Sequence, residues 1–140
     1  MIAEFQGAYR FLSNFFPSQE VPPTLEHRFQ AEKTLDLAWI NRILGATTPG
    51  AAKRLGRKAP LRKDWDQIKD QIMLDLVRKK FKQPDLRRLL LMTGTEELVE
   101  GNDWGDMYWG VVYSGTAGGR GHNKLGKILM QVRNEVRQSQ

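Results

Sequence analysis

Four polar residues near the start of the chain have types and spacing that could do chemistry together. They lie in the stretch TLEHRFQAEKT, residues 24–34, and are Glu26, His27, Gln30 and Lys33. If this stretch is helical, Glu26, Gln30 and Lys33 are four and three positions apart and share one face within roughly 60°. An amine beside a carboxylate on such a face can act as a nucleophile. An exposed polar stripe fits the same spacing, and spacing alone favours that simpler interpretation.

Charge is unevenly distributed along the sequence. The net charge is +6, from 22 Lys and Arg against 16 Asp and Glu; residues 51–63 contain no acid, and residues 96–106 contain no base. A basic surface beside an acidic loop suits an anionic ligand, such as a phosphate, held near carboxylates that do chemistry. Arg10, Lys53 and Arg57 are candidate phosphate contacts. Ordinary solvated faces explain the same charge runs and are favoured on composition alone.

Composition limits the classes of protein and site. With 140 residues, 40% of them hydrophobic and 27% charged, the chain is expected to fold as one domain over residues 1–140. The sequence has no cysteine and two histidines, so disulfides and thiolate chemistry are excluded and no metal site is predicted. The N-terminus resembles neither a signal peptide nor a membrane span. We therefore expect a cytoplasmic protein without membrane contact.

Periodicity and capping residues predict a mostly helical α+β domain with a small β-sheet. Residues 1–17 alternate aromatic and polar side chains, which is typical of a strand and turn. Two short extended segments are expected within residues 96–102 and 106–113. The expected helices are one capped by Thr24 with a break or bend near Thr34, one from Asp36 to Leu44, one from Thr48 that stops at Gly56, one capped by Asp64, one from Pro84 to Gly94, and one from Asn123 to about Val136.

One stretch matches most, but not all, of a nucleotide-binding motif. The stretch GHNKLGKI has Gly121, Gly126 and Lys127 at the spacing of a phosphate-binding loop. The next residue is Ile128, where that motif needs a hydroxyl to hold magnesium. A nucleoside triphosphatase is therefore not predicted.

Seven blocks in order resemble the NADAR family, also called YbiA-like. The blocks are FLSNFFP, EHRFQAEK, ATTPGAAKRLGR, DWDQIKDQIM, VRKKF, LLLMTGTEELVEGNDWGDMYWG and GHNKLGKILMQVR. The resemblance runs from about Phe5 to Arg133, which is nearly the whole chain.

The resemblance implies an N-glycosidase that cleaves a ribosyl–nitrogen bond, with no obligatory metal or cofactor. Two phosphorylated substrate classes are associated with the family: ADP-ribose attached to guanine in nucleic acid, and early intermediates of riboflavin synthesis. We assign predicted catalytic roles to Glu26, Lys33, Glu100 and Asp106. The predicted substrate-binding residues are Arg10, Ser13, Asn14, His27, Gln30, Trp65, Trp104 and Asn123.

The chemistry of this bond explains why such residues are needed. Cleavage develops positive charge on the sugar at C1′ and negative charge on the departing base, so a carboxylate can stabilise the sugar while an acid assists the base. Lys33 offers a second route, in which its amine attacks C1′ and forms a Schiff base with the opened ribose. The alternative to an enzyme is a non-catalytic module that binds ADP-ribose or nucleic acid, and the positive charge leaves a transient nucleic-acid contact open.

Two features depart from the family pattern. The connection SQEVPPTL, residues 18–25, is shorter than usual, which puts the cover of the pocket in doubt. Arg28 follows the histidine where a small residue is more usual, and it either adds a phosphate contact or faces solvent.

Overall fold

The chain forms two compact units in a computed structural model that describes residues 1–113 and 118–140. Unit 1 comprises residues 1–13 and 84–140, and unit 2 comprises residues 14–83. The single domain over residues 1–140 stays a prediction. No helix within the described residues is long and apolar enough to cross a membrane.

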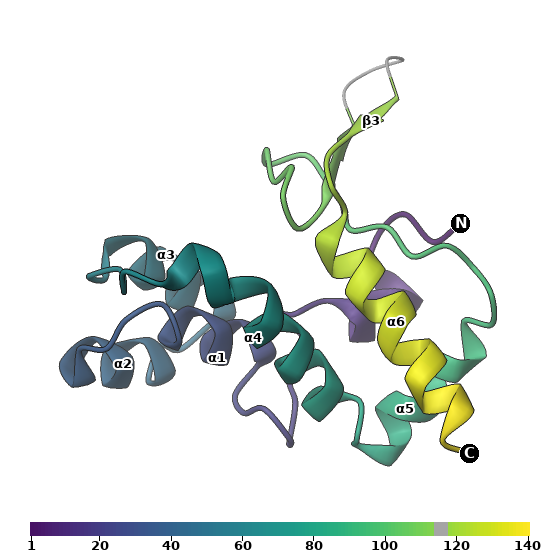
Figure 1. Ribbon diagram of the computed structural model, residues 1–140, viewed down its shortest axis with the longest axis horizontal. Coiled ribbons are helices and arrows are strands. Elements are labelled where there is room, and N and C mark those ends of the chain that lie inside the picture. Colours follow the sequence, from purple (N-terminus) through teal and green to yellow (C-terminus); the bar gives the residue numbers. More distant parts are fainter. Residues whose placement is uncertain (114–117) are drawn as a thin grey trace. The chain divides into compact units, whose positions relative to one another are not determined.

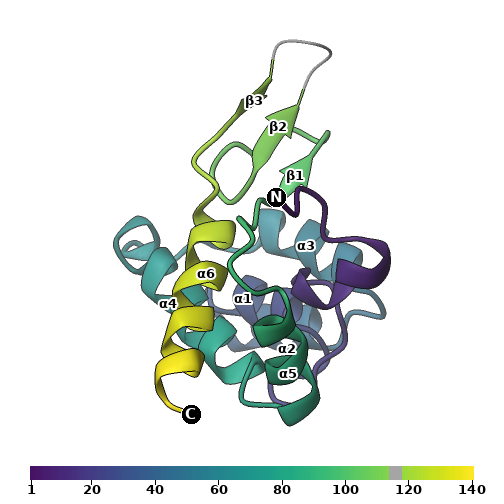
Figure 2. The same cartoon turned by 90° about the vertical axis from the view of Figure 1, so that its right-hand side faces the viewer.

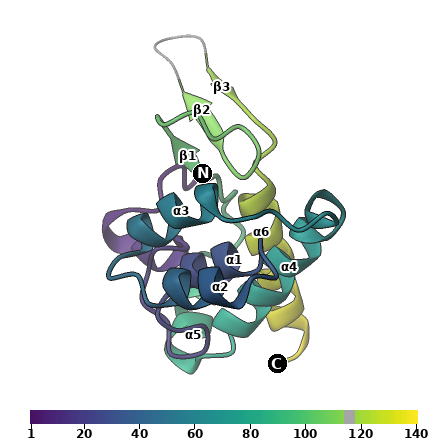
Figure 3. The same cartoon turned by 90° about the vertical axis from the view of Figure 1, so that its left-hand side faces the viewer.

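Unit 2 consists of four helices that are grouped together (Figure 1). They are α1 (Leu25–Ala31), α2 (Leu37–Leu44), α3 (Pro49–Lys58) and α4 (Trp65–Lys80). Helix α1 contacts each of the other three, and Figure 3 shows α2 alongside it. Ala31, Ile43 and Ala52, one from each of α1, α2 and α3, form a buried apolar cluster between these helices. The small side chains of the two alanines allow close approach of the backbones.

Side-chain caps begin three of these helices as the sequence predicts. The hydroxyls of Thr24 and Thr48 accept hydrogen bonds from the backbone N–H groups of His27 and Ala51, and the Asp36 carboxylate accepts from Ala38 and Trp39. Such caps satisfy N–H groups that have no partner within the helix.

The break expected near Thr34 is present, because α1 ends at Ala31 and α2 begins at Leu37. Two other local predictions in unit 2 are wrong. Gly56 does not end α3, which continues to Lys58, because this glycine is needed inside the helix for close packing. Asp64 occupies the N-cap position of α4 without capping it, because Arg62 binds its carboxylate.

Unit 1 contains a short helix, two longer helices and a small sheet. They are the 3₁₀ helix η1 (Gly7–Leu12), α5 (Pro84–Met92), α6 (Lys124–Gln138) and strands β1 (Gly101–Asn102), β2 (Val111–Tyr113) and β3 (Gly119–Arg120). Helix α5 packs against both η1 and α6. The strands lie in the order β1-β2-β3 (Figure 2), with β1 parallel and β3 antiparallel to β2. The predicted α+β class, mostly helical with a small sheet, is confirmed.

The strand expected within residues 1–17 is wrong for most of that range. Ile2 makes a single bridge to Leu98, but residues 7–12 form η1. Phe11 and Leu12 are adjacent and both buried, which a strand with one buried face cannot provide. Gly7, at φ +58°, allows the chain to turn into η1.

Candidate functional site

The start of α1 is fixed by a histidine whose two ring nitrogens both contact protein groups. Nδ1 of His27 lies 2.8 Å from the Thr24 hydroxyl, and Nε2 lies 2.9 Å from the backbone oxygen of Ala46. A carbonyl oxygen only accepts, so Nε2 carries a proton and donates a hydrogen bond to the backbone oxygen of Ala46. His27 therefore ties α1 to the end of α2, and its ring nitrogens are already engaged.

Glu26 and Gln30 lie on one face of α1, as their spacing predicts, but this face is buried. Their side chains are 6% and 4% exposed, and Gln30 Nε2 donates a 3.0 Å hydrogen bond to Glu26 Oε1. The backbone N–H of Glu26 donates to the oxygen of Asn14 at 3.0 Å. Burial of a carboxylate is costly unless it has polar partners. An exposed polar stripe is therefore excluded for Glu26 and Gln30.

The amide of Gln30 rests on the backbone of Gly56 in α3. A Cβ atom at Gly56 would come within 1.9 Å of Gln30 Oε1 and 2.8 Å of its Cδ. Oε1 is buried and accepts no hydrogen bond from any described residue. Gly56 thus leaves room for the amide that binds Glu26.

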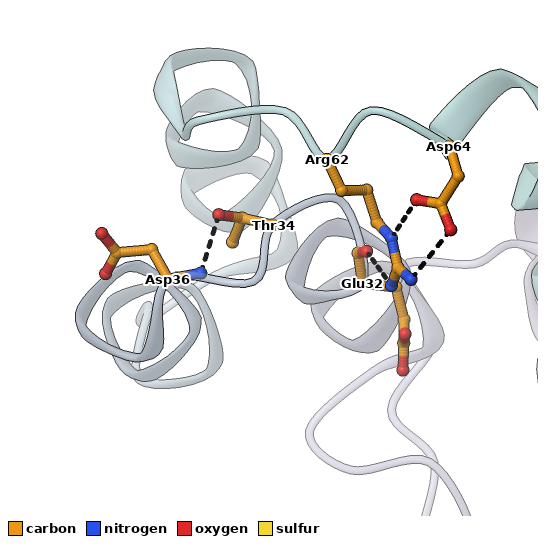
Figure 4. A network of polar contacts seen from close by, with 5 residues as sticks. All are labelled: Glu32, Thr34, Asp36, Arg62 and Asp64. Atoms are coloured by element: carbon orange, nitrogen blue, oxygen red, sulfur yellow. Dashed lines mark hydrogen bonds and ion pairs between the residues drawn. The ribbon is translucent and has the colours of Figure 1, made fainter.

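Lys33 lies just beyond α1, in a segment held by Arg62 (Figure 4). The Arg62 guanidinium binds both carboxylate oxygens of Asp64, at 2.7 and 3.2 Å, and donates to the backbone oxygen of Glu32 at 3.4 Å. The backbone N–H of Arg62 donates to the oxygen of Lys33 at 2.8 Å. The hydrogen bonds from the Arg62 side chain hold the pKa of Asp64 below its usual range. These contacts of Arg62 fix the backbone of Glu32 and Lys33.

The surroundings of the Lys33 amine lower its pKa below the ordinary value. Burial is the main cause that lowers the pKa of Lys33, and the positive charges of Arg57, Lys53 and Lys69 lower it further. The negative charge of Glu26 acts in the opposite direction and raises it. Lys33 therefore lies near a carboxylate on α1 and near basic side chains from α3 and α4.

Two other predicted binding residues of unit 2 contribute to packing. Trp65 is buried at the start of α4, with its ring 5.1 Å from that of Phe29. Asn14 is half-buried, and its Nδ2 donates to the sulfur of Met73 at 3.6 Å. Their predicted contact with substrate stays a prediction.

In unit 1, Asn123 links the backbone of residue 100 to the start of α6. Asn123 is buried in the left-handed conformation, at φ +50°. Its Oδ1 accepts from the backbone N–H of Glu100 and its Nδ2 donates to the oxygen of Leu98, each at 3.0 Å. Asparagine tolerates this conformation better than most residues. Asn123 thus positions the backbone of Glu100.

The Asp106 carboxylate is held within its own loop. Its Oδ1 accepts hydrogen bonds from the backbone N–H groups of Tyr108 and Trp109, at 3.1 and 2.9 Å. The buried amide of Asn102 bonds both the N–H and the oxygen of Asp106, at 3.0 and 2.9 Å. Asp106 therefore shapes the loop that leads to β2, in addition to its predicted catalytic role.

The remaining predicted residues of unit 1 are more exposed. Trp104 is 55% exposed in the loop after β1. Arg10 is exposed on η1, and the half-buried Ser13 caps the end of η1 with a backbone hydrogen bond to the oxygen of Arg10.

Two residues that position the candidate groups were not predicted. Asn102 lies between a glycine and an aspartate, a pattern typical of an ordinary turn. Arg62 lies in a basic segment that composition alone assigns to a solvated surface. Within residues 1–113 and 118–140, no three His, Asp or Glu side chains are grouped closely enough to hold a metal ion.

The fold and these side chains define a helical α+β domain with a buried carboxylate and a nearby amine. The NADAR domain family matches residues 4–137, and the chain belongs to this family. The NMR structure of the E. coli protein YbiA has a TM-score of 0.81 and 38% identity, over 99% of this chain and 86% of that one. Both the predicted family and the predicted fold are thus confirmed.

Named relatives agree with the class that the resemblance implied. An N-glycosidase of Nostoc punctiforme is 44% identical over 140 residues, 92% of this chain and 86% of the relative. N-glycosidase YbiA of Escherichia coli K12 is 42% identical over 117 residues, 81% of this chain and 70% of the relative. A riboflavin biosynthesis protein of Vibrio vulnificus is 38% identical over 138 residues, which cover 91% of this chain but 36% of that protein.

Proposed function

We propose that this protein is an N-glycosidase that hydrolyses the bond between a ribosyl carbon and the nitrogen of a base. The observation that carries the proposal is the buried Glu26 carboxylate, held by Gln30 near the half-buried amine of Lys33. The names of its relatives support the same class of enzyme. A protein that only binds anions gains nothing from a buried carboxylate, which repels its ligand.

Glu26 acts on the sugar in this proposal. Positive charge develops at C1′ as the bond to the base breaks, and a carboxylate in a water-poor environment stabilises it. One well-placed group of this kind contributes about 3 kcal/mol, or roughly a hundredfold in rate. Glu100 and Asp106 keep their assigned roles as candidates for activating water and protonating the departing base.

Lys33 provides the covalent route. Its neutral amine attacks C1′ while the C–N bond breaks, and the base leaves with the electron pair and takes up a proton. The ring then opens as the C1′–O4′ bond breaks and O4′ is protonated, which leaves a protonated Schiff base on Lys33. Water adds to C1′ and releases the sugar and the amine. The lowered pKa of Lys33 supports this route, because it increases the fraction of the nucleophilic form at neutral pH.

A phosphorylated ribosyl compound is the proposed substrate. Lys53 and Arg57 of α3 and Lys69 of α4 surround Lys33 closely enough to lower its pKa, and this local positive charge suits a phosphate group. Two classes stay open: ADP-ribosyl-guanine in nucleic acid, which the +6 net charge favours, and a riboflavin intermediate, which the name of the Vibrio vulnificus relative favours. We also propose a cytoplasmic location, because the sequence contains no cysteine that could form a disulfide.

The test is to incubate the protein with an ADP-ribosyl-guanine oligonucleotide and, separately, with phosphoribosylated intermediates of flavin synthesis. We expect release of base from one substrate and about a hundredfold loss in Glu26→Gln. The matched control is Glu20→Gln, which changes an exposed carboxylate of the same unit. Binding without cleavage of either substrate would support the non-catalytic module instead.

Borohydride separates the two routes. The covalent route predicts a reduced protein–sugar adduct that is absent in Lys33→Ala and present in Lys82→Ala, a change of an exposed lysine. An active enzyme that gives no adduct would exclude the Schiff base. Lys33→Arg would then retain much of the activity, because Lys33 would serve only to bind phosphate or to pair with Glu26.

A further inference from the structure

Unit 1 contains a pocket of about 400 Å³ between the N-terminal segment, β1 and the loop after β1. The residues that line it include the aromatic residues Trp104 and Tyr113, the acidic residues Glu4 and Asp103, and Gln6. All of these residues belong to unit 1, whereas Glu26 belongs to unit 2.

The aromatic rings remain accessible although they are large apolar groups. Trp104 is 55% exposed and Tyr113 is 41% exposed. Large aromatic side chains that stay accessible within a concave surface are typical of ligand sites. Their faces carry negative electrostatic potential and attract cations.

The charges of the pocket favour the same kind of ligand. Glu4 and Asp103 bring two carboxylates, and no lysine or arginine side chain is among the described residues that line the pocket. The positive N-terminus of Met1 also lines the pocket, but it is paired with the carboxylate of Glu96. A phosphate group would be repelled, although the protein as a whole carries a charge of +6. A guanidinium or ammonium group would instead be attracted by both the carboxylates and the rings.

The chain already uses this contact elsewhere. The guanidinium of Arg42 lies 4.4 Å from the ring centre of Trp39, and the amine of Lys124 lies 5.5 Å from that of Tyr108. These distances are within the range of a favourable cation–π contact. The same physics applies to an external cation that reaches Trp104.

We propose that the pocket lined by Trp104, Tyr113, Glu4 and Asp103 binds an organic cation, a guanidinium or alkylammonium group. The cation lies against the aromatic rings while the two carboxylates accept its N–H groups or pair with its charge. The ligand is either the basic side chain of a partner protein or a small free cation. This inference does not depend on the proposed glycosidase activity.

The test is NMR titration of the isotope-labelled protein, following the indole N–H signals and the backbone signals of residues 101–104. The probes are N-acetyl-arginine amide, which represents a basic side chain, and choline, which represents a free cation. Each is paired with a neutral compound of the same shape, N-acetyl-citrulline amide and 3,3-dimethylbutanol. We expect at least one cation to shift these signals with a dissociation constant of about 1 mM, and its neutral partner to bind at least about fivefold more weakly.

Variants and salt locate the site. Glu4→Gln and Asp103→Asn should each weaken binding about fivefold, and Trp104→Ala should abolish the shifts near it. Glu20→Gln and Trp39→Phe, both in unit 2, are the controls and should leave binding unchanged. In the unaltered protein, binding should weaken as ionic strength rises from about 0.01 to 0.15 M.

Three results would overturn the proposal. They are equal binding of the charged and neutral probes, affinity that neither carboxylate variant lowers, and tighter binding of guanosine than of either cation. Binding to the unaltered protein that does not weaken as the ionic strength rises would also overturn it, so the proposal stays testable even if a variant fails to fold.

Discussion

Replacing Gly56 by alanine should displace Gln30 from Glu26, although this is a change of one methyl group on a helix. The added Cβ would lie 1.9 Å from Gln30 Oε1 and 3.1 Å from Gln30 Cβ. The amide must therefore move by about 1 Å in a close-packed interior, where little space is open to it. Its 3.0 Å hydrogen bond to the Glu26 carboxylate would be lost.

The magnitude follows from two opposing effects. Loss of a hydrogen bond to a buried carboxylate costs about 1.5–3 kcal/mol. Alanine in place of glycine within a helix gains about 1 kcal/mol. Gly56→Ala should therefore lower the free energy of unfolding by about 0.5–2 kcal/mol. The matched control is Gly50→Ala in the same helix, where the nearest atom is an Arg54 nitrogen at an ordinary 3.7 Å and a gain of about 0.5–1 kcal/mol is expected.

The assay is urea unfolding of a double-mutant cycle between Gly56→Ala and Gln30→Ala. Once Gln30 is truncated, Gly56→Ala should become neutral or stabilising, which gives a coupling energy of about 2 kcal/mol. If Gly56→Ala costs the same free energy with and without the Gln30 amide, the proposed steric link is wrong. In either background, Gly50→Ala reports the helix propensity alone.

The remaining predictions concern Lys33 and Asn102. The pKa of Lys33 should lie below 10.5, fall further in Glu26→Gln and rise in Arg57→Gln, as measured by NMR titration of the amine. Because the unfolded chain binds the proton of Lys33 more tightly, stability should rise with pH between the lowered pKa and 10.5, and Lys33→Met should remove this contribution; an unchanged slope would contradict the assigned burial. Asn102→Ala should destabilise the protein by about 2–4 kcal/mol in thermal unfolding, because it leaves both backbone groups of Asp106 without the buried amide. A cost below about 0.5 kcal/mol, the usual limit for a surface change, would show that Asn102 does not hold the loop.

Helix starts were predictable because the cap is a contact between near neighbours. Thr24, Asp36 and Thr48 each bond an N–H two or three residues ahead, so the sequence contains the whole interaction. Asp64 shows the limit of this reasoning. Arg62, two residues earlier, binds both carboxylate oxygens of Asp64. A prediction from cap preferences does not include this competing side chain.

Contacts between residues that are distant in sequence explain the other wrong predictions. Gly56 was predicted to stop a helix because glycine often does so, but its role depends on Gln30, a residue of another helix. The face shared by Glu26 and Gln30 was correctly predicted from spacing, whereas its burial depends on how α3 packs against α1. Periodicity within one helix contains no information about the neighbour that covers it. Lys33 was placed by the same periodicity on a helix that ends two residues before it.

The junction at the start of α6 has an evolutionary consequence. A Cβ at Gly126 would approach the two amide atoms of Asn123 within 2.3 and 2.4 Å and the oxygen of Leu98 within 2.2 Å. Asparagine and glycine three positions apart are therefore one structural unit. Among relatives, we expect the glycine to persist wherever the asparagine is present, and replacement of the asparagine alone should not permit a side chain at the glycine, because the backbone oxygen of Leu98 would still meet it.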